Sequence, residues 1–134
     1  MASELKVDKF TGVTTAGSIL VTGEGTATTN LQQGLAKGWM NFDQDTPTID
    51  DSLNIASVTD HSAGKFSPQY TNSFGNVNYA CSGVTNNTIF ICLEDGNSET
   101  TETTTSGTKM HAMQHNGTLF DCEQTMVIWH GDLA

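Results

Sequence analysis

The sequence predicts an all-β protein, an antiparallel β-sandwich of jelly-roll-like form with an extended N-terminal arm. Apolar residues make up 36% of the 134 residues and charged residues only 15%, so Thr, Asn, Ser, Gly and Gln fill much of the chain. This charge density is too low for a typical disordered chain. β-Branched and aromatic residues recur at short intervals, with turn-forming residues between them. That spacing is typical of a sandwich built from short strands.

Residues 1–35 are predicted to form the arm and residues 36–134 the sandwich domain. Residues 11–30 contain only short apolar islands separated by Gly and Thr, and Ile19–Val21 is the best of them. So little apolar area cannot offset the entropy lost when the segment becomes ordered. We therefore expect the arm to need a partner surface, either the main domain or another chain.

A short helical turn and a first strand are predicted next. Asn30 or the residue before it is placed to cap one helical turn that ends at Gly34. Lys37–Phe42 then alternates in the manner of a strand. The alternation places Trp39 and Asn41 on one face and the residues between and after them on the other.

A hairpin is predicted from Leu53–Thr59 and Lys65–Tyr70. The five residues between the two runs are a turn-forming cluster, and Gly64 at their end is placed to adopt a positive φ.

A second hairpin is predicted from Val77–Thr85 and Thr88–Leu93, which flank Asn86-Asn87. Asparagine tolerates the left-handed conformation that a two-residue turn requires. In this register Cys81 lies opposite Cys92, in a hydrogen-bonded pair with Cα atoms about 5.5 Å apart. A disulfide there would be strained, so two reduced thiols that pack as small hydrophobic groups are expected.

The last third of the chain begins with a polar tract and continues with two strands. Residues 96–108 contain no apolar residue, which indicates a solvated loop, an edge strand or a contact loop. Lys109–Gln114 and Thr125–His130 are the predicted strands. Asn116-Gly117, between them, is a turn signal.

Charge excludes several classes of function. Five lysines, no arginine and fifteen acidic residues give a net charge of −10, which disfavours binding to nucleic acids and to anionic membranes. The N-terminus has no basic region followed by an apolar stretch, so no secretion signal and no membrane insertion are expected. The three cysteines lack metal-site spacing, and their odd number fits folding in a reducing cytosol.

Motifs for catalysis or metal binding are scarce, and no catalytic residue, cofactor or metal is predicted. The motifs of serine hydrolases, phosphate-binding loops, dinucleotide-binding folds and zinc proteases are absent. His111 and His115 share a face, and a three-histidine metal site would also need folding to bring His130 near them. Ordinary surface or inter-subunit histidines are the favoured interpretation, because Asn116-Gly117 would break a helix here.

Three acidic pairs are candidates for a calcium site or a glycosidase pair. None has the Gly and distal Glu of a helix–loop–helix calcium site, and solvated turns are the favoured interpretation. The pairs are Asp43 with Asp45, Asp50 with Asp51, and Glu94 with Asp95.

Six segments carry a resemblance to a known family. They are Glu4–Asp8, Leu35–Phe42 (LAKGWMNF), Ile49–Asp60 (IDDSLNIASVTD), Gly64–Phe66, Asn76–Ala80 (NVNYA) and Val127–Asp132. Together they resemble a domain common in bacteriophage tail fibres and other virion proteins, especially of marine and cyanobacterial phages. The resemblance spans about residues 30–132 and is thinner over residues 86–120.

The resemblance implies a β-rich, trimeric module on the outside of a phage particle. Family members often follow a long shaft, whereas here fewer than forty residues precede the domain. We therefore expect a capsid decoration or cement protein, or a short-fibre subunit, on the virion surface. The arm would attach it to capsid or tail proteins. The resemblance brings no catalytic residue with it.

Two other functions are weighed against this one. The alternative is a host-recognition module that binds surface glycan or protein through loops at 60–64 and 96–108. Neither loop contains an aromatic residue, which counts against sugar binding. An enzyme, such as a small depolymerase that uses Asp50 or Asp51, comes third because no motif supports it.

Overall fold

The computed structural model describes residues 4–12, 19–22, 26–87, 89–93 and 103–134, and every structural statement below concerns these residues. The chain divides into two compact units, Met1–Leu35 and Ala36–Ala134. The all-β class with antiparallel sheets, predicted from the sequence, is confirmed.

The first unit contains a small sheet and one helical turn. Strand β1 (Leu20–Thr22) pairs antiparallel with β2 (Thr28–Asn30), and α1 (Leu31–Gly34) follows at once, as predicted. The Leu31 N–H donates to the carbonyl of Ile19 at 2.8 Å. Among the residues of this unit whose exposure the structure describes, which leaves out Gln32 and Gln33, none is buried. Two-stranded sheets of this kind are only marginally stable alone in water.

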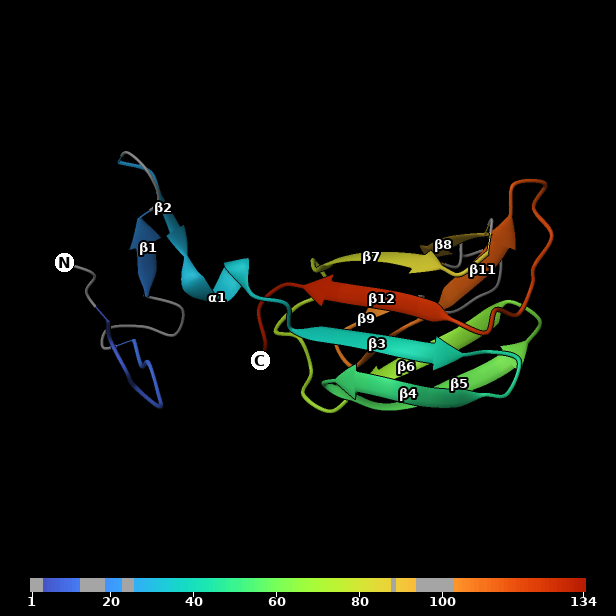
Figure 1. Cartoon of the computed structure of the whole chain (residues 1–134), viewed down its shortest axis with the longest axis horizontal. Coiled ribbons are helices and arrows are strands. Elements are labelled where there is room, and N and C mark those ends of the chain that lie inside the picture. Colours follow the sequence, from blue (N-terminus) through green and yellow to red (C-terminus); the bar gives the residue numbers. More distant parts are fainter. Residues whose placement is uncertain (1–3, 13–18, 23–25, 88, 94–102) are drawn as a thin grey trace. The chain divides into compact units, whose positions relative to one another are not determined.

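The second unit is built from two antiparallel sheets (Figure 1). The first has the strand order β4-β3-β12-β7, from β3 (Gly38–Asp43), β4 (Thr48–Leu53), β7 (Ala80–Thr85) and β12 (Thr125–His130). The second has the order β8-β11-β6-β10-β9, with β5 on the other side of β6. Its strands are β5 (Ile55–Ser62), β6 (Lys65–Tyr70), β8 (Ile89–Leu93), β9 (Thr103–Thr104), β10 (Gly107–Thr108) and β11 (Met110–Gln114).

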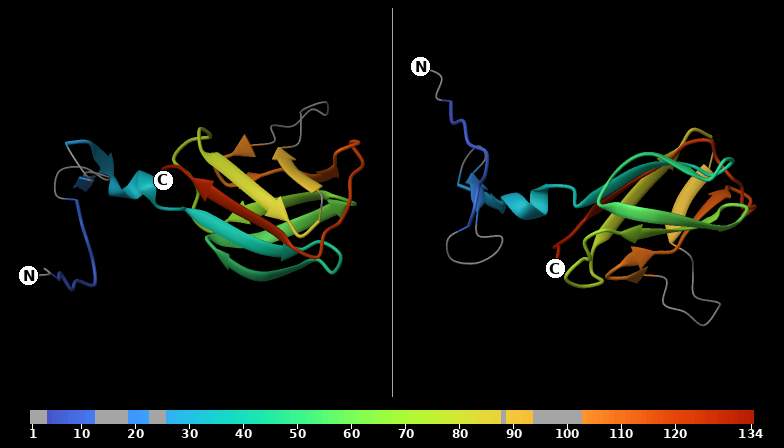
Figure 2. Two further views of the ribbon diagram at one scale, coloured as in Figure 1. Left: turned by 45° about the horizontal axis from the view of Figure 1, so that its top comes forward. Right: turned by 90° about the horizontal axis from the view of Figure 1, so that it is seen from below.

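The two sheets share one hydrophobic core, which lies between them (Figure 2). In β3 the predicted alternation is confirmed: Met40 and Phe42 are buried, while Trp39 and Asn41 are partly exposed. The core contains residues from both sheets and from the segments that join them. They are Met40, Phe42, Phe66, Tyr70, Phe74, Met110, Ala112, Cys122, Val127 and Trp129.

Aromatic rings link the sheets at one end of the core. Tyr70 contacts the rings of Phe74, Tyr79 and Trp129 edge to face, with centroids 5.0, 5.8 and 5.7 Å away. The Tyr70 hydroxyl shares a short hydrogen bond with the Thr108 hydroxyl. The Tyr79 hydroxyl lies 2.8 Å from the same Thr108 oxygen. Edge-to-face pairs add to the stability that burial alone provides.

The buried Tyr70 phenol predicts a loss of stability at alkaline pH. Burial raises its pKa above the ordinary value, and the hydrogen bond with Thr108 acts in the opposite direction. Because the unfolded chain ionises near pH 10, the stabilising contribution is complete below that pH and is lost as the pH rises further. We expect Tyr70→Phe to cost about 1–2 kcal/mol at pH 7 and to weaken the alkaline loss. Urea unfolding at pH 7 to 11 would measure both effects. An alkaline loss of the same size in the variant would contradict the assignment to Tyr70.

The hairpin predicted between residues 53 and 70 is confirmed in its pairing, but its limits differ. Strand β5 continues to Ser62, so only two residues separate it from β6, and Gly64 has the expected positive φ of 69°. At the other end Asn54, with a φ of 62°, separates β4 from β5. The Asn54 side chain accepts a hydrogen bond from the Asn72 N–H at 2.7 Å and donates to the Asn72 carbonyl at 3.0 Å. These bonds hold a corner where the sequence indicated one continuous strand.

The hairpin predicted around Asn86-Asn87 is wrong. Strand β7 pairs with β12 in one sheet and β8 pairs with β11 in the other, so the connection crosses between sheets. Cys81 therefore lies opposite Trp129 and not opposite Cys92. The chain bends at Asn86 and Asn87, but neither residue has the positive φ expected for a two-residue hairpin turn. A turn signal does not specify whether the next strand returns to the same sheet.

The last strands agree closely with prediction. Strand β12 has the predicted limits, β11 begins one residue later than predicted, and Gly117 between them has a φ of 83°. Of the polar tract at 96–108, residues 96–102 lie outside the described part. Its end forms the β9–β10 pair at the end of the second sheet, which confirms the edge-strand interpretation there.

Candidate interaction surfaces

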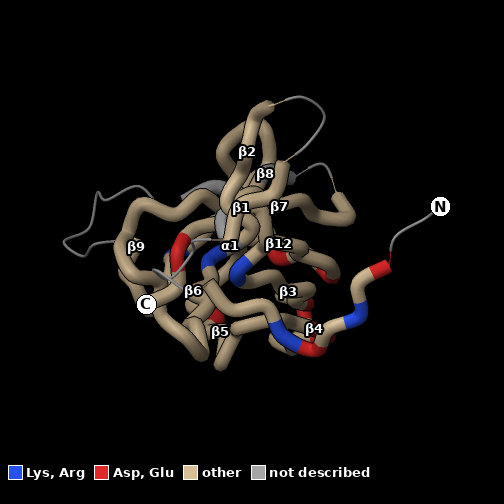
Figure 3. Tube along the Cα trace, turned by 90° about the vertical axis from the view of Figure 1, so that its left-hand side faces the viewer, with Lys and Arg blue, Asp and Glu red and all other residues tan. Residues whose placement is uncertain are grey.

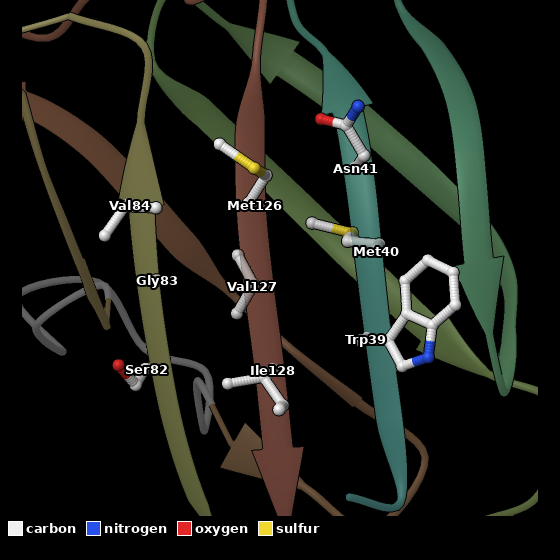
Figure 4. Close-up of a pocket in the computed structure, with 9 residues that line it drawn as sticks. All are labelled: Trp39, Met40, Asn41, Ser82, Gly83, Val84, Met126, Val127 and Ile128. Atoms are coloured by element: carbon white, nitrogen blue, oxygen red, sulfur yellow. The ribbon is translucent and has the colours of Figure 1, made fainter.

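The outer face of the first sheet carries an apolar groove of about 430 Å³ (Figure 4). In β12 the inward residues are buried, whereas Met126 and Ile128 point outward with exposed fractions of 39% and 37%. Val84 on β7 is opposite Met126, and Trp39 on β3 is opposite Ile128. The groove is lined by Trp39, Met40, Asn41, Ser82, Gly83, Val84, Met126, Val127 and Ile128.

No ionisable side chain lines this groove, although the chain carries a net charge of −10. Leu53 on the edge strand β4 is opposite Trp39 and 47% exposed, so it extends the apolar row across the sheet. Two acidic residues border the face at Asn41: Asp51 is opposite Asn41, and Asp50 accepts a hydrogen bond from the Asn41 amide at 3.3 Å. The face is chemically suited to bind another apolar surface.

The sequence of β12 contains a pattern that indicates this exposed apolar face, although the pattern was not among the predictions above. Met126 to Trp129 are all apolar, so both sides of the strand are apolar and not one alone. Such continuous runs are typical of strands covered on both faces.

A polar groove of about 350 Å³ lies on the second sheet. His61 and Ser67 face each other across β5 and β6, with the His61 Nε2 atom 2.8 Å from the Ser67 hydroxyl. The groove is lined by residues from both segments predicted as recognition loops: His61 comes from 60–64, and residues from 104 to 108 come from 96–108. Its lining consists of Thr59, His61, Ser67, Gln69, Thr104, Ser106, Gly107, Thr108 and Lys109. These groups suit a hydroxyl-rich ligand, but no aromatic ring is among them.

The three histidines considered as metal ligands are not brought together. His111 lies in β11 of the second sheet, His115 in the turn that follows, and His130 in β12 of the first sheet. Within the described ranges, no group of three or more His, Cys, Asp or Glu side chains could hold a metal ion.

The acidic pairs serve turns and strand edges. The Thr46 hydroxyl and N–H donate to the Asp43 carboxylate at 2.6 and 3.1 Å, and these hydrogen bonds hold the pKa of Asp43 below its ordinary value. Asp51 accepts the N–H of its neighbour Ser52 at 2.8 Å. Glu94 and Asp95 lie outside the described residues. Asp43 is thus a turn-capping residue.

Two cysteines are free thiols, Cys81 in β7 and Cys122 before β12. Burial raises the pKa of both, which lowers the fraction of thiolate and hence their reactivity. The side chain of Cys92 lies outside the described residues.

Comparison of the chain with models of protein families, with curated proteins and with solved structures finds no match. In the described part of the chain, no helix is long and apolar enough to cross a membrane.

Proposed function

We propose that the chain is a non-enzymatic structural protein of a bacteriophage virion. It is a capsid decoration or cement protein, or a short-fibre subunit, exposed on the particle surface. The observation that carries the proposal is the apolar outer face of the sheet β4-β3-β12-β7, with Met126 and Ile128 at its centre. A face of this kind favours a role in assembly, because large exposed apolar patches are often interaction sites.

Two further features support this role. The segments from Leu35 to Ala80 resemble virion proteins of phages, and the strongly acidic surface fits a protein that faces solvent and not the packaged genome. The acidic pairs of the described residues act in turns and strand edges, which favours a structural protein over a depolymerase.

We further propose the finer architecture implied by the sequence and its resemblance: a β-sandwich in residues 36–134, an arm in residues 1–35 for virion attachment and subunit contacts, and a homotrimer. The shared core of the two sheets supports the sandwich. The jelly-roll detail gains no support from the strand order, in which β3 and β4 stay in one sheet and β5 and β6 in the other.

The second candidate is a receptor-binding module for a host glycan or protein. The polar groove favours it, because that groove joins His61 with Thr104–Thr108, from the two segments expected to recognise a host. The lack of aromatic rings in the groove makes it the weaker candidate. Purified chain in excess would block adsorption of the phage to host cells under this second function, but not under the first.

The attachment role predicts a result in assembled particles. Virions of the phage that encodes this chain should contain it, and electron microscopy should place it outside the shell or tail. A chain without residues 1–30 should keep its circular dichroism spectrum, apart from the deleted segment, and should not be incorporated. Absence of the full chain from purified virions would contradict the structural role. Normal incorporation of the shortened chain would contradict the arm.

A further inference from the structure

The apolar face of the first sheet is larger than one groove. Four strands spaced about 4.8 Å apart, each contributing about five residues of 3.3 Å, give a footprint of about 300 Å². This footprint includes the polar residues Asn41, Asp51 and Ser82 as well as the apolar side chains, and exposed apolar patches of this kind are often functional. Its central row consists of Leu53, Trp39, Ile128 and Ser82, and the next row contains Val84 and Met126.

The distribution of charge argues against covering this face with the same face of another copy. Residues 36–134 contain three lysines and twelve acidic residues, a net charge of −9. Figure 3 marks the acidic residues in red and the lysines in blue. Two such domains packed face to face would bring two net charges of −9 together in one dimer, which like-charge repulsion disfavours.

Residues 1–35 carry little net charge, and their own apolar side chains are exposed. They contain two lysines and three acidic residues, a net charge of only −1. Their described residues are all at least partly exposed, and Leu20 and Val21 of β1 have exposed fractions of 61% and 47%. Other exposed apolar side chains of this unit are Leu5, Val7, Phe10 and Leu35.

We propose that the apolar face of β4-β3-β12-β7 binds residues 1–35 of a second copy of this chain, through the exposed apolar side chains of β1. The contact would bury two apolar sets that each lack cover among the described residues. This inference rests on the proposed function. In a virion, many copies of the chain lie side by side, so each copy has the residues 1–35 of a neighbour within reach.

Symmetry agrees with such a contact. A segment of one copy that binds a different surface of the next copy makes a head-to-tail contact, which closes into a ring when the rotation permits. A trimer with threefold symmetry requires a contact of this type. A self-complementary contact between two identical faces would give a dimer instead.

The test uses the full chain and two complementary variants. One carries Leu20→Ser with Val21→Ser, and the other carries Met126→Lys with Ile128→Lys. Sedimentation velocity at micromolar concentration should find the unmodified chain assembled. Each variant should be folded but monomeric at this concentration. The dissociation constant of its self-assembly should be at least tenfold higher than that of the unmodified chain. Val77→Lys, at an exposed position outside the groove, is the matched control and should assemble normally.

Mixing the two variants distinguishes the possible partners. The first variant keeps an intact sheet face and the second keeps an intact N-terminal segment, so an equimolar mixture should form a mixed dimer that cannot grow further. Assembly of the Leu20→Ser, Val21→Ser chain at the level of the unmodified chain would overturn the inference in favour of face-to-face packing. Monomeric unmodified chain, or no complex in the mixture, would also overturn it. These results are independent of the virion experiment: a chain that assembles in this way yet is absent from virions would contradict the structural role alone.

Discussion

Trp129→Ala is expected to lower the free energy of unfolding by about 3–5 kcal/mol, the cost typical of removing a large buried aromatic side chain. Trp129 has no exposed surface and lies in β12, between β3 and β7. Its ring packs edge to face on Tyr70 of the opposite sheet, with centroids 5.7 Å apart. Alanine would therefore leave a cavity between the two sheets. Urea unfolding followed by circular dichroism would measure the change.

Two control substitutions sharpen this prediction. Trp129→Phe should cost clearly less than Trp129→Ala, because it keeps a ring and removes a buried indole N–H that has no hydrogen-bond partner among the described residues. Trp39→Ala removes the same side chain from the outer face of the same sheet, where it is already partly exposed, and should also cost less. Equal losses for the alanine variants of Trp39 and Trp129 would contradict the assignment of inner and outer faces.

The sequence predicted those parts of the fold that depend on local chemistry. Alternation in β3 identified its buried side, and the Gly64 and Gly117 turns were found because glycine favours a positive φ. Pairing between distant strands was not predictable in the same way. Asn86-Asn87 is a turn signal in the sequence, yet neither residue has a positive φ, and β7 has its partner in β12, forty residues or more away in the chain. Alternation indicates which side of a strand is buried but not which strand lies beside it.

The candidate interaction face was only partly predictable for a related reason. The apolar run of β12 indicates a strand covered on both sides, but the outer row also needs Val84 and Leu53 from other strands. Their exposure follows from the strand order, which the sequence did not specify. Asn54 is a similar case, because its left-handed conformation is held by Asn72, eighteen positions further along the chain.

Gly64→Ala is expected to be the most damaging single-methyl change in the turns, with a loss of about 2–5 kcal/mol. The left-handed conformation accounts for about 1–2 kcal/mol of it and overpacking for about 1–3 kcal/mol. A Cβ atom at Gly64 would lie against the Ala112 carbonyl oxygen and 2.7 Å from the Phe120 nitrogen. Both are backbone atoms, and they cannot move independently because the Phe120 N–H donates to the Ala112 carbonyl at 3.1 Å.

Hydrogen bonds of Gly64 itself prevent the turn from moving aside. Its N–H donates to the Asp121 carboxylate at 2.6 Å, and its carbonyl accepts from the Ala112 N–H at 2.7 Å. Gly117→Ala is the matched control: Gly117 also has a positive φ, 83°, but apart from Gly117 and its two chain neighbours no described residue has an atom within 4 Å of the added methyl group. It should therefore lose only the conformational part, about 1–2 kcal/mol. Urea unfolding measures the loss of unfolding free energy in each variant. The difference between the two losses is the cost of separating the β5–β6 turn from β11 and from the segment after β11. Equal losses would mean that these three segments do not meet as closely as the structure places them.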